Sequence, residues 1–578
     1  MAPLRVEYKY SMRAVIVFCL MALSIVDAAW KPLPENLKED LIVYQVYPRS
    51  FKDSNGDGIG DIEGIKQKLD HFLEMGVDMF WLSPIYPSPM VDFGYDISNY
   101  TDVHPIFGTI SDLDNLVNAA HEKGLKIILD FVPNHTSDQH EWFQLSLKNI
   151  EPYNNYYIWH PGKIVNGKRV PPTNWVGVFG GSAWSWREER QAYYLHQFAP
   201  EQPDLNYYNP VVLDDMQNVL RFWLRRGLDG FRVDALPYIC EDMRFLDEPL
   251  SGETNDPNKT EYTLKIYTHD IPETYNVVRK FRDVLDEFPQ PKHMLIEAYT
   301  NLSMTMKYYD YGADFPFNFA FIKNVSKNSN SSDFKKLVDN WMTYMPANGI
   351  PNWVPGNHDQ LRLVSRFGEE KARMITTMSL LLPGVAVNYY GDEIGMSDTY
   401  ISWEDTQDPQ GCGAGKENYQ EMSRDPARTP FQWDDSVSAG FSSSSNTWLR
   451  VNENYKTVNL AAEKKDKNSF FNMFKKFASL KKSPYFKEAN LNTRMLNDNV
   501  FAFSRETEHN GSLYAIMNFS KEEQIVDLEA FNNVPKKLNM FYNNFNSDVQ
   551  SISNNEQVKV PALGFLVLIS QDAKFGNF

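Results

Sequence analysis

Eight short apolar segments alternate with helical segments between residues 41 and 393, and polar clusters follow several of the apolar segments. Such alternation is typical of a parallel sheet whose strands are joined by helices, and eight repeats predict an α/β fold of the (β/α)8 TIM barrel type. The predicted strands are Leu41–Tyr47, Val77–Leu82, Leu125–Phe131, Gly230–Ala235, Met294–Glu297, Ala313–Asn318, Pro351–Val354 and Val385–Tyr390. Because the carboxyl ends of barrel strands meet at one face, we expect the polar clusters to form one site there.

The alternation is interrupted once and stops near residue 485. Residues 133–203 follow the third predicted strand and are rich in Trp, Tyr, Gly and Asn, which predicts an inserted loop-rich domain. Residues 485–578 contain strand-like runs such as Val500–Phe503 and Leu513–Ile516, which predict a C-terminal antiparallel β-domain, a β-sandwich. The barrel would then comprise residues 29–132 and 204–484. The polar segment 331–340 is expected to be a solvated surface.

The first 28 residues have the order of features of a secretory signal peptide. Arg5, Lys9 and Arg13 precede an apolar run over residues 14–25, and small residues follow at 26–28. The run is short for a bilayer span, although a signal anchor is the alternative. We therefore predict a secreted protein with no membrane partner and with N-linked glycans. The predicted acceptor sequences begin at Asn99, Asn258, Asn301, Asn324, Asn330, Asn510 and Asn518, whereas Asn134, also in such a sequence, is expected to be buried.

Composition excludes some partners and permits others. The net charge of −18 disfavours nucleic acid and anionic membrane surfaces as partners. Aromatic residues make up 14% of the chain, which permits an aromatic-lined cleft. Only Cys240 and Cys412 lie outside the predicted signal peptide, and whether they pair is left open by the sequence.

The predicted strand ends carry acids, an arginine and histidines. Arg232 and Asp234 point the same way from one strand, and we expect the arginine to keep the carboxylate ionised by lowering its pKa. The other strand ends supply Asp130 with His135, Glu297, and His358 with Asp359. Paired carboxylates in an aromatic cleft are the groups that cleave glycosidic bonds. A structural Arg–Asp pair and packed core histidines are the alternatives.

A loop after the first predicted strand has oxygen-bearing side chains at every second position from Asp53 to Asp61. Gly58 permits a sharp turn, and this pattern favours a loop around a hard cation. The twelfth position is Gly64, where an EF-hand needs a bidentate Glu, so no EF-hand is predicted. A loop closed by Asx turns without a metal is the alternative.

These motifs together resemble the α-amylase family, glycoside hydrolase family 13. The segments 130–135, 230–234 and 357–359, together with Glu297, are similar to its four signature regions. The segment 202–206 resembles the extra motif of the oligo-1,6-glucosidase subfamily, and the loop 53–61 resembles the calcium loop of that subfamily. The resemblance runs from about residue 30 to the end of the chain and is strongest to secreted maltases of the insect type.

The resemblance implies a role for each motif residue. Asp234 would be the nucleophile, Glu297 the general acid and base, and Asp359 the stabiliser of the transition state. The residues that would hold the terminal glucose are Asp92, Tyr95, His135, Arg232, His358 and Arg428. A pair between Asp92 and Arg428 would close the pocket behind that sugar, with Arg424 as the alternative partner. A structural calcium ion would be bound by Asp53, Asn55, Asp57, the carbonyl of Ile59, and Asp61, and no cofactor would take part in catalysis.

The implied function is that of a secreted exo-acting α-glucosidase of the maltase or sucrase type. It would act on oligosaccharides, maltose and sucrose with retention, which requires the carboxyls of Asp234 and Glu297 to lie roughly 5–5.5 Å apart. Ala235 follows the nucleophile where relatives that favour α-1,6 links tend to have Val, so we expect preference for maltose and sucrose. Transglycosylase or sucrose isomerase activity is the alternative within this pocket. An extracellular ancillary subunit of an amino-acid transporter is the alternative without catalysis.

Overall fold

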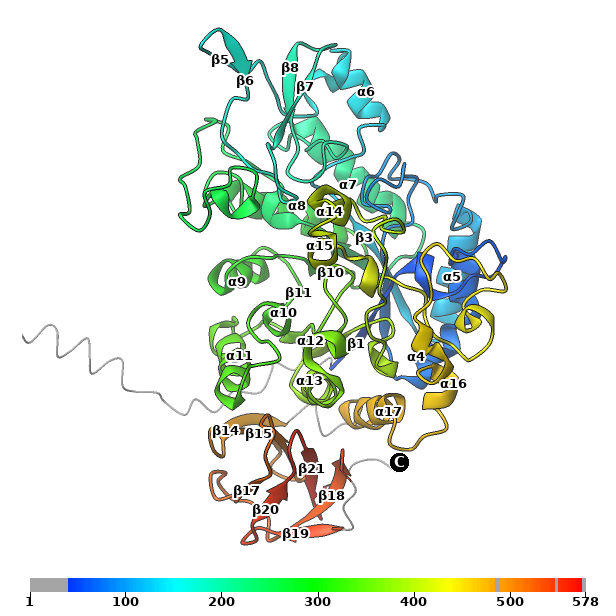
Figure 1. The fold of residues 1–578 in the computed structure, drawn as a ribbon, viewed down its shortest axis with the longest axis vertical. Coiled ribbons are helices and arrows are strands. Elements are labelled where there is room, and N and C mark those ends of the chain that lie inside the picture. Colours follow the sequence, from blue (N-terminus) through cyan, green and yellow to red (C-terminus); the bar gives the residue numbers. More distant parts are fainter. Residues whose placement is uncertain (1–39, 484–488, 546–548, 574–578) are drawn as a thin grey trace, which may run out of the picture.

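The computed structural model describes residues 40–483, 489–545 and 549–573. The predicted signal peptide, residues 1–28, lies outside these residues. Among the described residues, no helix is long and apolar enough to cross a membrane. Figure 1 shows three parts stacked along the long axis, with the barrel in the middle, residues 133–203 above it and the C-terminal strands below it.

Eight parallel strands form the barrel, which confirms the predicted fold class. Their order is β11-β10-β9-β3-β2-β1-β13-β12, and their bounds are Ile42–Val46 (β1), Met79–Leu82 (β2), Lys126–Phe131 (β3), Gly230–Val233 (β9), His293–Ile296 (β10), Phe315–Pro316 (β11), Asn352–Trp353 (β12) and Val385–Tyr389 (β13). The two strands at the ends of this order are joined through a side chain: Asn352 Nδ2 donates to the Pro316 carbonyl at 2.7 Å, and its Oδ1 accepts from Asn318 N at 2.7 Å. A buried side-chain amide therefore bridges the seam of the barrel.

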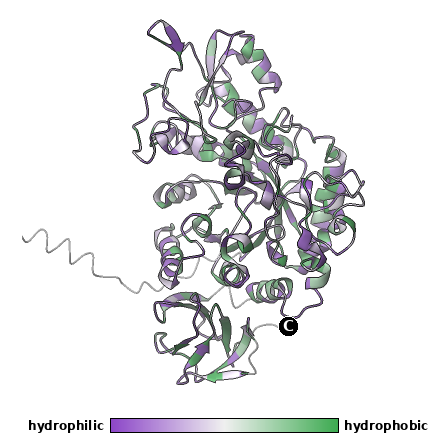
Figure 2. Cartoon of the chain, in the orientation of Figure 1, coloured by the Kyte–Doolittle hydropathy of each residue, from purple (hydrophilic) through white to green (hydrophobic). Residues whose placement is uncertain are grey.

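Helices surround the sheet because each has one apolar face. The principal barrel helices are Ile62–Gln67 (α3), Leu69–Glu74 (α4), Ile110–Glu122 (α5), Pro210–Leu224 (α7), Pro272–Leu285 (α8), Leu302–Asp310 (α9), Ser331–Tyr344 (α11), Leu363–Phe367 (α12), Glu369–Leu381 (α13) and Phe470–Lys481 (α17). In α5 the buried residues Leu113, Leu116, Val117 and Ala120 recur at helical spacing. Figure 2 shows green and purple residues along the same helices, as expected for helices with one buried face.

Residues 133–203 form a small domain that leaves the barrel and returns to it at the same place. Leu205 N donates to Asn134 O at 2.9 Å, and Thr136 N donates to Pro203 O at 3.2 Å. The domain contains helix Glu141–Leu147 (α6), a three-stranded antiparallel sheet of Trp159–His160 (β4), Ala192–Leu195 (β8) and Trp184–Arg187 (β7), and a hairpin of Lys163–Val165 (β5) and Lys168–Val170 (β6). Trp175 and Trp184 stack in a small core, against which Phe245 and Tyr267 from outside the insertion also pack. The loop between β3 and α7 is thus a folded unit.

The C-terminal domain packs its large sheet against the barrel. The order of that sheet is Asn490–Met495 (β14), Val500–Glu506 (β15), Ser512–Asn518 (β16), Phe565–Ser570 (β21), Lys537–Asn543 (β18) and Ser551–Ser553 (β19), and Gln524–Val526 (β17) pairs with Val558–Val560 (β20). Phe501 and Phe503 belong to the main core, whereas Val500 and Ala502 face the second core under the β17–β20 pair. The side chains of a strand point alternately to its two faces, so β15 serves both cores.

The expectation of a solvated surface at residues 331–340 is wrong. This segment begins α11, which buries Phe334, Leu337, Val338 and Trp341. Phe334 stacks on Phe519 of the C-terminal domain with ring centroids 4.1 Å apart. Part of the apolar face of helix α11 is therefore covered by a residue about 180 positions later in the chain.

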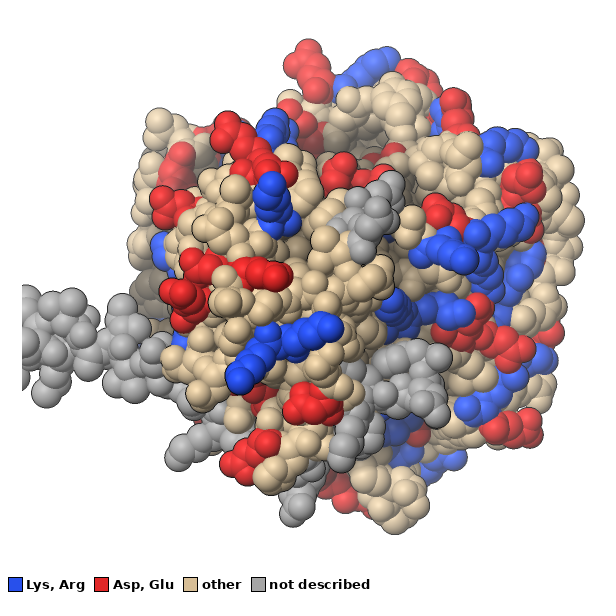
Figure 3. Space-filling model, turned by 90° about the horizontal axis from the view of Figure 1, so that it is seen from below, with Lys and Arg blue, Asp and Glu red and all other residues tan. Residues whose placement is uncertain are grey.

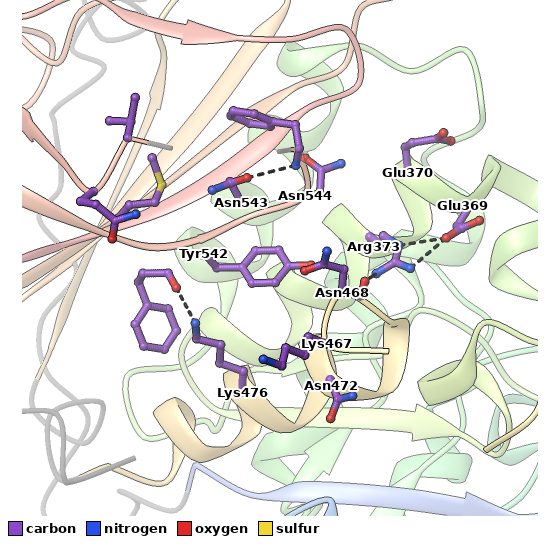
Figure 4. Close-up of a pocket in the computed structure, with 15 residues that line it drawn as sticks. Glu369, Glu370, Arg373, Lys467, Asn468, Asn472, Lys476, Tyr542, Asn543 and Asn544 are labelled. Atoms are coloured by element: carbon purple, nitrogen blue, oxygen red, sulfur yellow. Dashed lines mark hydrogen bonds and ion pairs between the residues drawn. The ribbon is translucent and has the colours of Figure 1, made fainter. Parts of the chain in front are cut away.

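A polar cleft of about 840 Å³ lies between α13, the segment 467–476 and β18. Figure 4 shows Arg373 beside Glu369 on the barrel side, and Lys476 Nζ donates to the carbonyl of Phe541 at 2.6 Å across the cleft.

Acidic and basic side chains are interspersed on the face of the molecule seen in Figure 3.

Candidate active site

A pocket of about 260 Å³ lies at the carboxyl ends of the barrel strands, where residues 133–203 meet the barrel. Seven of the nine side chains predicted to act in catalysis or sugar binding line it: Asp92, Tyr95, His135, Asp234, Glu297, His358 and Asp359. Phe179, Phe198, Tyr238 and Tyr299 add aromatic walls. Arg232 and Arg428, the other two predicted residues, are buried behind the wall with 1% and 0% exposure.

Three carboxyl groups surround the guanidinium of Arg232. Its Nη1 lies 2.7 Å from Asp130 Oδ1 and also contacts Asp234 Oδ1, and its Nη2 lies 2.6 Å from Glu297 Oε1. Parallel pairing of β3, β9 and β10 places these strand ends side by side. Arg232 therefore orients Asp234 and Glu297 toward the pocket from behind.

The backbone turns sharply after Asp234. The strand ends at Val233, and Ala235 adopts a left-handed conformation with φ of 50°. This unusual conformation for a residue with a Cβ aims the Ala235 N–H at Glu297 Oε2, 3.0 Å away. The backbone N–H of Ala235 thus holds the carboxyl group of Glu297 in place. This contact was not expected from the sequence, because the predicted strand Gly230–Ala235 extends two residues beyond the observed one.

Burial makes Asp234 and Glu297 harder to ionise. Burial raises the pKa of Asp234 to about 7, although Arg232 acts in the opposite direction. Burial also raises the pKa of Glu297 to about 8, again against Arg232, and Asp234 contributes to the rise. The expectation that Arg232 would give Asp234 a lowered pKa is wrong, because loss of water outweighs the nearby positive charge.

Asp359 has the opposite electrostatic environment. Burial raises its pKa, but the polar His358 ring beside it and the charges of Arg424 and Arg428 outweigh burial and hold the pKa well below its usual range. Arg428 Nη2 lies 3.0 Å from Asp359 Oδ1, and Arg424 Nη1 lies 3.2 Å from the same oxygen. At neutral pH the pocket therefore presents an ionised Asp359 beside a Glu297 that retains its proton. Carboxyl groups with pKa values pushed apart in this way are suited to different roles.

The partner of Asp92 is Arg424, and the expected pair with Arg428 is wrong. Arg424 Nη2 lies 2.7 Å from Asp92 Oδ1, and both side chains line the pocket. Arg428 instead donates through Nε to the carbonyl of His358 at 2.8 Å and supports Asp359. Arg424, the alternative named from the sequence, is therefore the arginine beside Asp92 in the pocket lining.

Hydrogen bonds determine which nitrogen of His358 carries the proton. Gln45 Nε2 lies 2.8 Å from His358 Nδ1 and can only donate, so the His358 proton is on Nε2, which lies 3.5 Å from Asp359 Oδ2. Burial lowers the pKa of His358 well below its usual value and that of His135 to about 4. Both rings are therefore neutral. His358 can donate a hydrogen bond from Nε2, next to Asp359.

Some pocket residues were missed by sequence reasoning. Gln202 lies within hydrogen-bond distance of Asp92 Oδ2 (3.3 Å) and His135 Nε2 (3.1 Å), and its position in the 202–206 motif was the available signal. Gln360 and Gln410 line the pocket with no comparable signal in the sequence. Of the aromatic residues in the insertion, Phe198 lines the pocket, whereas Trp184 belongs to the core of the insertion.

The loop predicted to bind calcium is closed by its own hydrogen bonds. Asp53 Oδ2 accepts from Gly58 N at 2.8 Å, and Asp61 Oδ1 accepts from Gly64 N at 2.6 Å, capping α3. Asn55 and Asp57 accept from backbone N–H groups two residues later. The oxygen ligand types suit a hard cation, but within the described residues no three acidic, histidine or cysteine side chains converge well enough to hold a metal ion. Calcium at this loop remains a prediction.

The structure also answers whether the two cysteines pair and whether Asn518 can carry a glycan. Cys240 is buried and Cys412 is exposed, and both are free thiols. Asn518 is fully buried, and its Nδ2 donates to the carbonyls of Glu522, Val560 and Pro561. A glycan on that nitrogen would displace these bonds, so the prediction of a glycan at Asn518 is not supported. Asn134 is buried as expected and donates to Tyr238 O at 2.6 Å.

Known proteins resemble this chain over nearly its full length. Residues 45–489 match the family described as alpha amylase, catalytic domain. The chain is 97% identical to a protein named alpha-glucosidase from Apis mellifera over 567 residues, which cover 98% of this chain and 100% of that protein. It is 46% identical to Maltase 1 of Drosophila virilis over 511 residues, covering 86% of this chain and 81% of that one.

Solved structures show the same architecture. The alpha-glucosyl transfer enzyme XgtA superposes with a TM-score of 0.82 at 31% sequence identity, covering 92% of this chain and 99% of that chain. The matched region includes the barrel, the insertion and the C-terminal strands, since so little of either chain is left out.

Proposed function

Since this chain belongs to the α-amylase family, we infer that it is an α-glucosidase that uses Asp234 and Glu297 to cleave terminal α-linked glucose. The observation that carries this inference is the cluster of Asp234 and Glu297 on Arg232, in a pocket that the paired Asp92 and Arg424 also line. Two carboxyl groups that face the same small pocket are what glycoside cleavage with a covalent intermediate needs.

We propose a double displacement with retention. A carboxylate oxygen of Asp234 forms a bond to the anomeric carbon while the bond to the leaving oxygen breaks and Glu297 transfers its proton to that oxygen. Glu297 then takes a proton from water, whose oxygen displaces Asp234 from the same carbon. The ionised Asp359 would stabilise the positive charge that develops on the sugar, and its lowered pKa supports this role.

We propose that the Asp92–Arg424 pair makes the enzyme act at chain ends. The pair is almost fully buried, with side-chain exposures of 5% and 9%, and both residues line the pocket, where they would block the continuation of the sugar chain. Maltose, sucrose and short maltooligosaccharides are the proposed substrates. The small Ala235 beside the nucleophile supports the preference for these over α-1,6 links.

The test is glucose release from maltose, sucrose, isomaltose and soluble starch. We expect rapid release from maltose or sucrose, slow release from isomaltose, and α-glucose as the first product seen by NMR before mutarotation. Fast isomaltose cleavage would refute the Ala235 inference, and β-glucose as first product would refute the double displacement.

Transfer to a second sugar is a second candidate activity. A structural neighbour of similar architecture is named an alpha-glucosyl transfer enzyme. The glycosyl–Asp234 intermediate can be intercepted by a sugar hydroxyl as well as by water. Incubation with concentrated sucrose separates the two: free glucose equal to fructose indicates hydrolysis, whereas oligosaccharides or sucrose isomers indicate transfer.

We propose that the loop 53–61 binds a structural calcium ion through Asp53, Asn55, Asp57, the carbonyl of Ile59, and Asp61. The support is the set of hard oxygen ligands, and binding requires these side chains to exchange hydrogen bonds to the backbone for bonds to the metal. Because a ligand that binds only the folded state stabilises it, EDTA is expected to lower the Tm by several degrees and calcium to restore it. If neither EDTA nor the Asp57→Ala substitution changes the Tm, the alternative of a loop closed by hydrogen bonds without a metal is favoured.

We also propose that the protein is secreted and carries N-linked glycans. The support is the order of charges and apolar residues in the first 28 positions, together with exposed acceptors at Asn99, Asn258, Asn301, Asn324 and Asn330 and a half-buried one at Asn510. Peptide mass spectrometry of protein from the culture medium should find a new N-terminus near residue 29 and glycans on some of these six, but none on Asn134 or Asn518.

A further inference from the structure

Asp408 contacts Arg424 but does not itself line the pocket. Arg424 lines the pocket, whereas Asp408 is fully buried and is absent from the pocket lining. Asp408 Oδ1 lies 2.5 Å from Arg424 Nη2 and 3.0 Å from Nε, and Asp408 Oδ2 accepts from the Arg424 backbone N at 2.7 Å. The two oxygens of one carboxylate therefore hold both the side chain and the backbone of one arginine.

The other contacts of Arg424 come from different loops. Asp92 follows β2, Asp359 follows β12, and Phe179, whose ring centroid lies 5.4 Å from the guanidinium carbon, comes from the insertion. Asp359 already has a second arginine, Arg428, on the same oxygen. If the charge of Asp408 were removed, the guanidinium of Arg424 would be attracted to Asp92 and Asp359 alone. Its Nε would also lose the carboxylate oxygen that now accepts its hydrogen bond.

Asp408 also lies at the start of a helix that contributes to the pocket. It is the N-cap residue of Pro409–Ala414 (α14), its carbonyl accepts from Cys412 N at 2.8 Å, and Gln410 of this helix lines the pocket. Asp408 therefore connects two parts of the pocket lining: the Asp92–Arg424 pair, through its contact with Arg424, and helix α14, which carries Gln410.

We propose that Asp408 is a positioning residue that holds Arg424 against Asp92 and so shapes the wall behind the terminal sugar. It acts on the sugar only through Arg424. This inference rests on the proposed role of the Asp92–Arg424 pair in sugar binding. Without Asp408, the wall loses its geometry, and the charge of Arg424 shifts toward Asp359, which is needed as a free carboxylate next to the sugar.

The experiment is a double-mutant cycle with Asp408→Asn and Arg424→Ala on the full-length protein. We expect Asp408→Asn to lower kcat/KM for maltose about 10- to 100-fold, mainly through KM, and to raise the inhibition constant of glucose, the product that would occupy the same pocket. In the Arg424→Ala background, Asp408→Asn should change kcat/KM by less than about 2-fold, because the partner is already gone. Asp408→Glu, which keeps the charge, should restore part of the activity.

The matched control is Asp405→Asn, which changes an exposed carboxylate on the same loop that contacts Ser402 and does not contact Arg424. It should leave kcat/KM unchanged. Equal losses from Asp408→Asn in both backgrounds would overturn the inference, as would a loss in kcat/KM with unchanged glucose inhibition. Full activity of Arg424→Ala would instead refute the proposed wall. Should Asp408→Asn fail to fold, the same cycle is run with Asp408→Ser, which also removes the charge, and the same outcomes apply.

Discussion

Replacing Asp234 with Asn is expected to lower kcat for maltose by roughly 10⁴-fold or more, because an amide cannot attack the anomeric carbon. Asn keeps the shape of Asp and can still accept a hydrogen bond from Arg232, which contacts Asp234 Oδ1. The substitution also removes a carboxyl whose pKa is raised by burial. The fold should therefore persist, and the Tm should change by only a few degrees.

The measurement is kcat for maltose together with labelling by 5-fluoro-α-glucosyl fluoride, which traps the covalent intermediate. Mass spectrometry of the wild type should place the label on Asp234, and the variant should carry none. Binding of deoxynojirimycin to the variant is the control for an intact pocket. A label on another carboxyl, or residual activity above about one per cent of wild type, would contradict the assignment of the nucleophile.

Replacing Glu297 with Gln is expected to lower maltose hydrolysis by roughly 10²–10⁴-fold. The effect should be much smaller with α-glucosyl fluoride in the first step, because fluoride leaves without a proton. The pKa of Glu297 is raised to about 8, so the acid is protonated below that pH and loses its proton above it. The wild type should therefore lose kcat/KM for maltose as the pH rises through about 8, whereas glycosylation of the variant by the fluoride should show no such loss.

Measuring the Tm of the wild type and of Glu297→Gln against pH shows whether the loss of activity comes from the missing acid or from misfolding. A raised pKa means that the folded state holds the proton more tightly than the unfolded state. Stability from Glu297 is therefore present at low pH and falls as the pH rises toward about 8. Gln does not ionise, so Glu297→Gln should have a Tm at pH 8 to 9 equal to or above that of the wild type. A lower Tm and equal losses with maltose and the fluoride would argue against the acid role.

The sequence by itself determined the barrel and the strand ends that bear the site. The runs that became β1, β3 and β13 are apolar and bounded by turn residues, so their assignment needed no tertiary information. Parallel strands place all their carboxyl ends at one face, which is why the order of residues alone groups Asp234, Glu297 and Asp359 in one site. The insertion was visible for the same reason, as a break in a regular alternation.

Only the tertiary structure decided the contacts made by loops and the effect of burial. Arg424 and Arg428 are four residues apart, and which of them meets Asp92 depends on the path of the chain after β13. Helix α11 has an apolar face on which Phe334 is covered by Phe519 of the distant C-terminal domain, and that contact exists only in the folded chain. The pKa of Asp234 rises although Arg232 adjoins it, because desolvation depends on every atom that excludes water, and these atoms come from many separate segments of the chain.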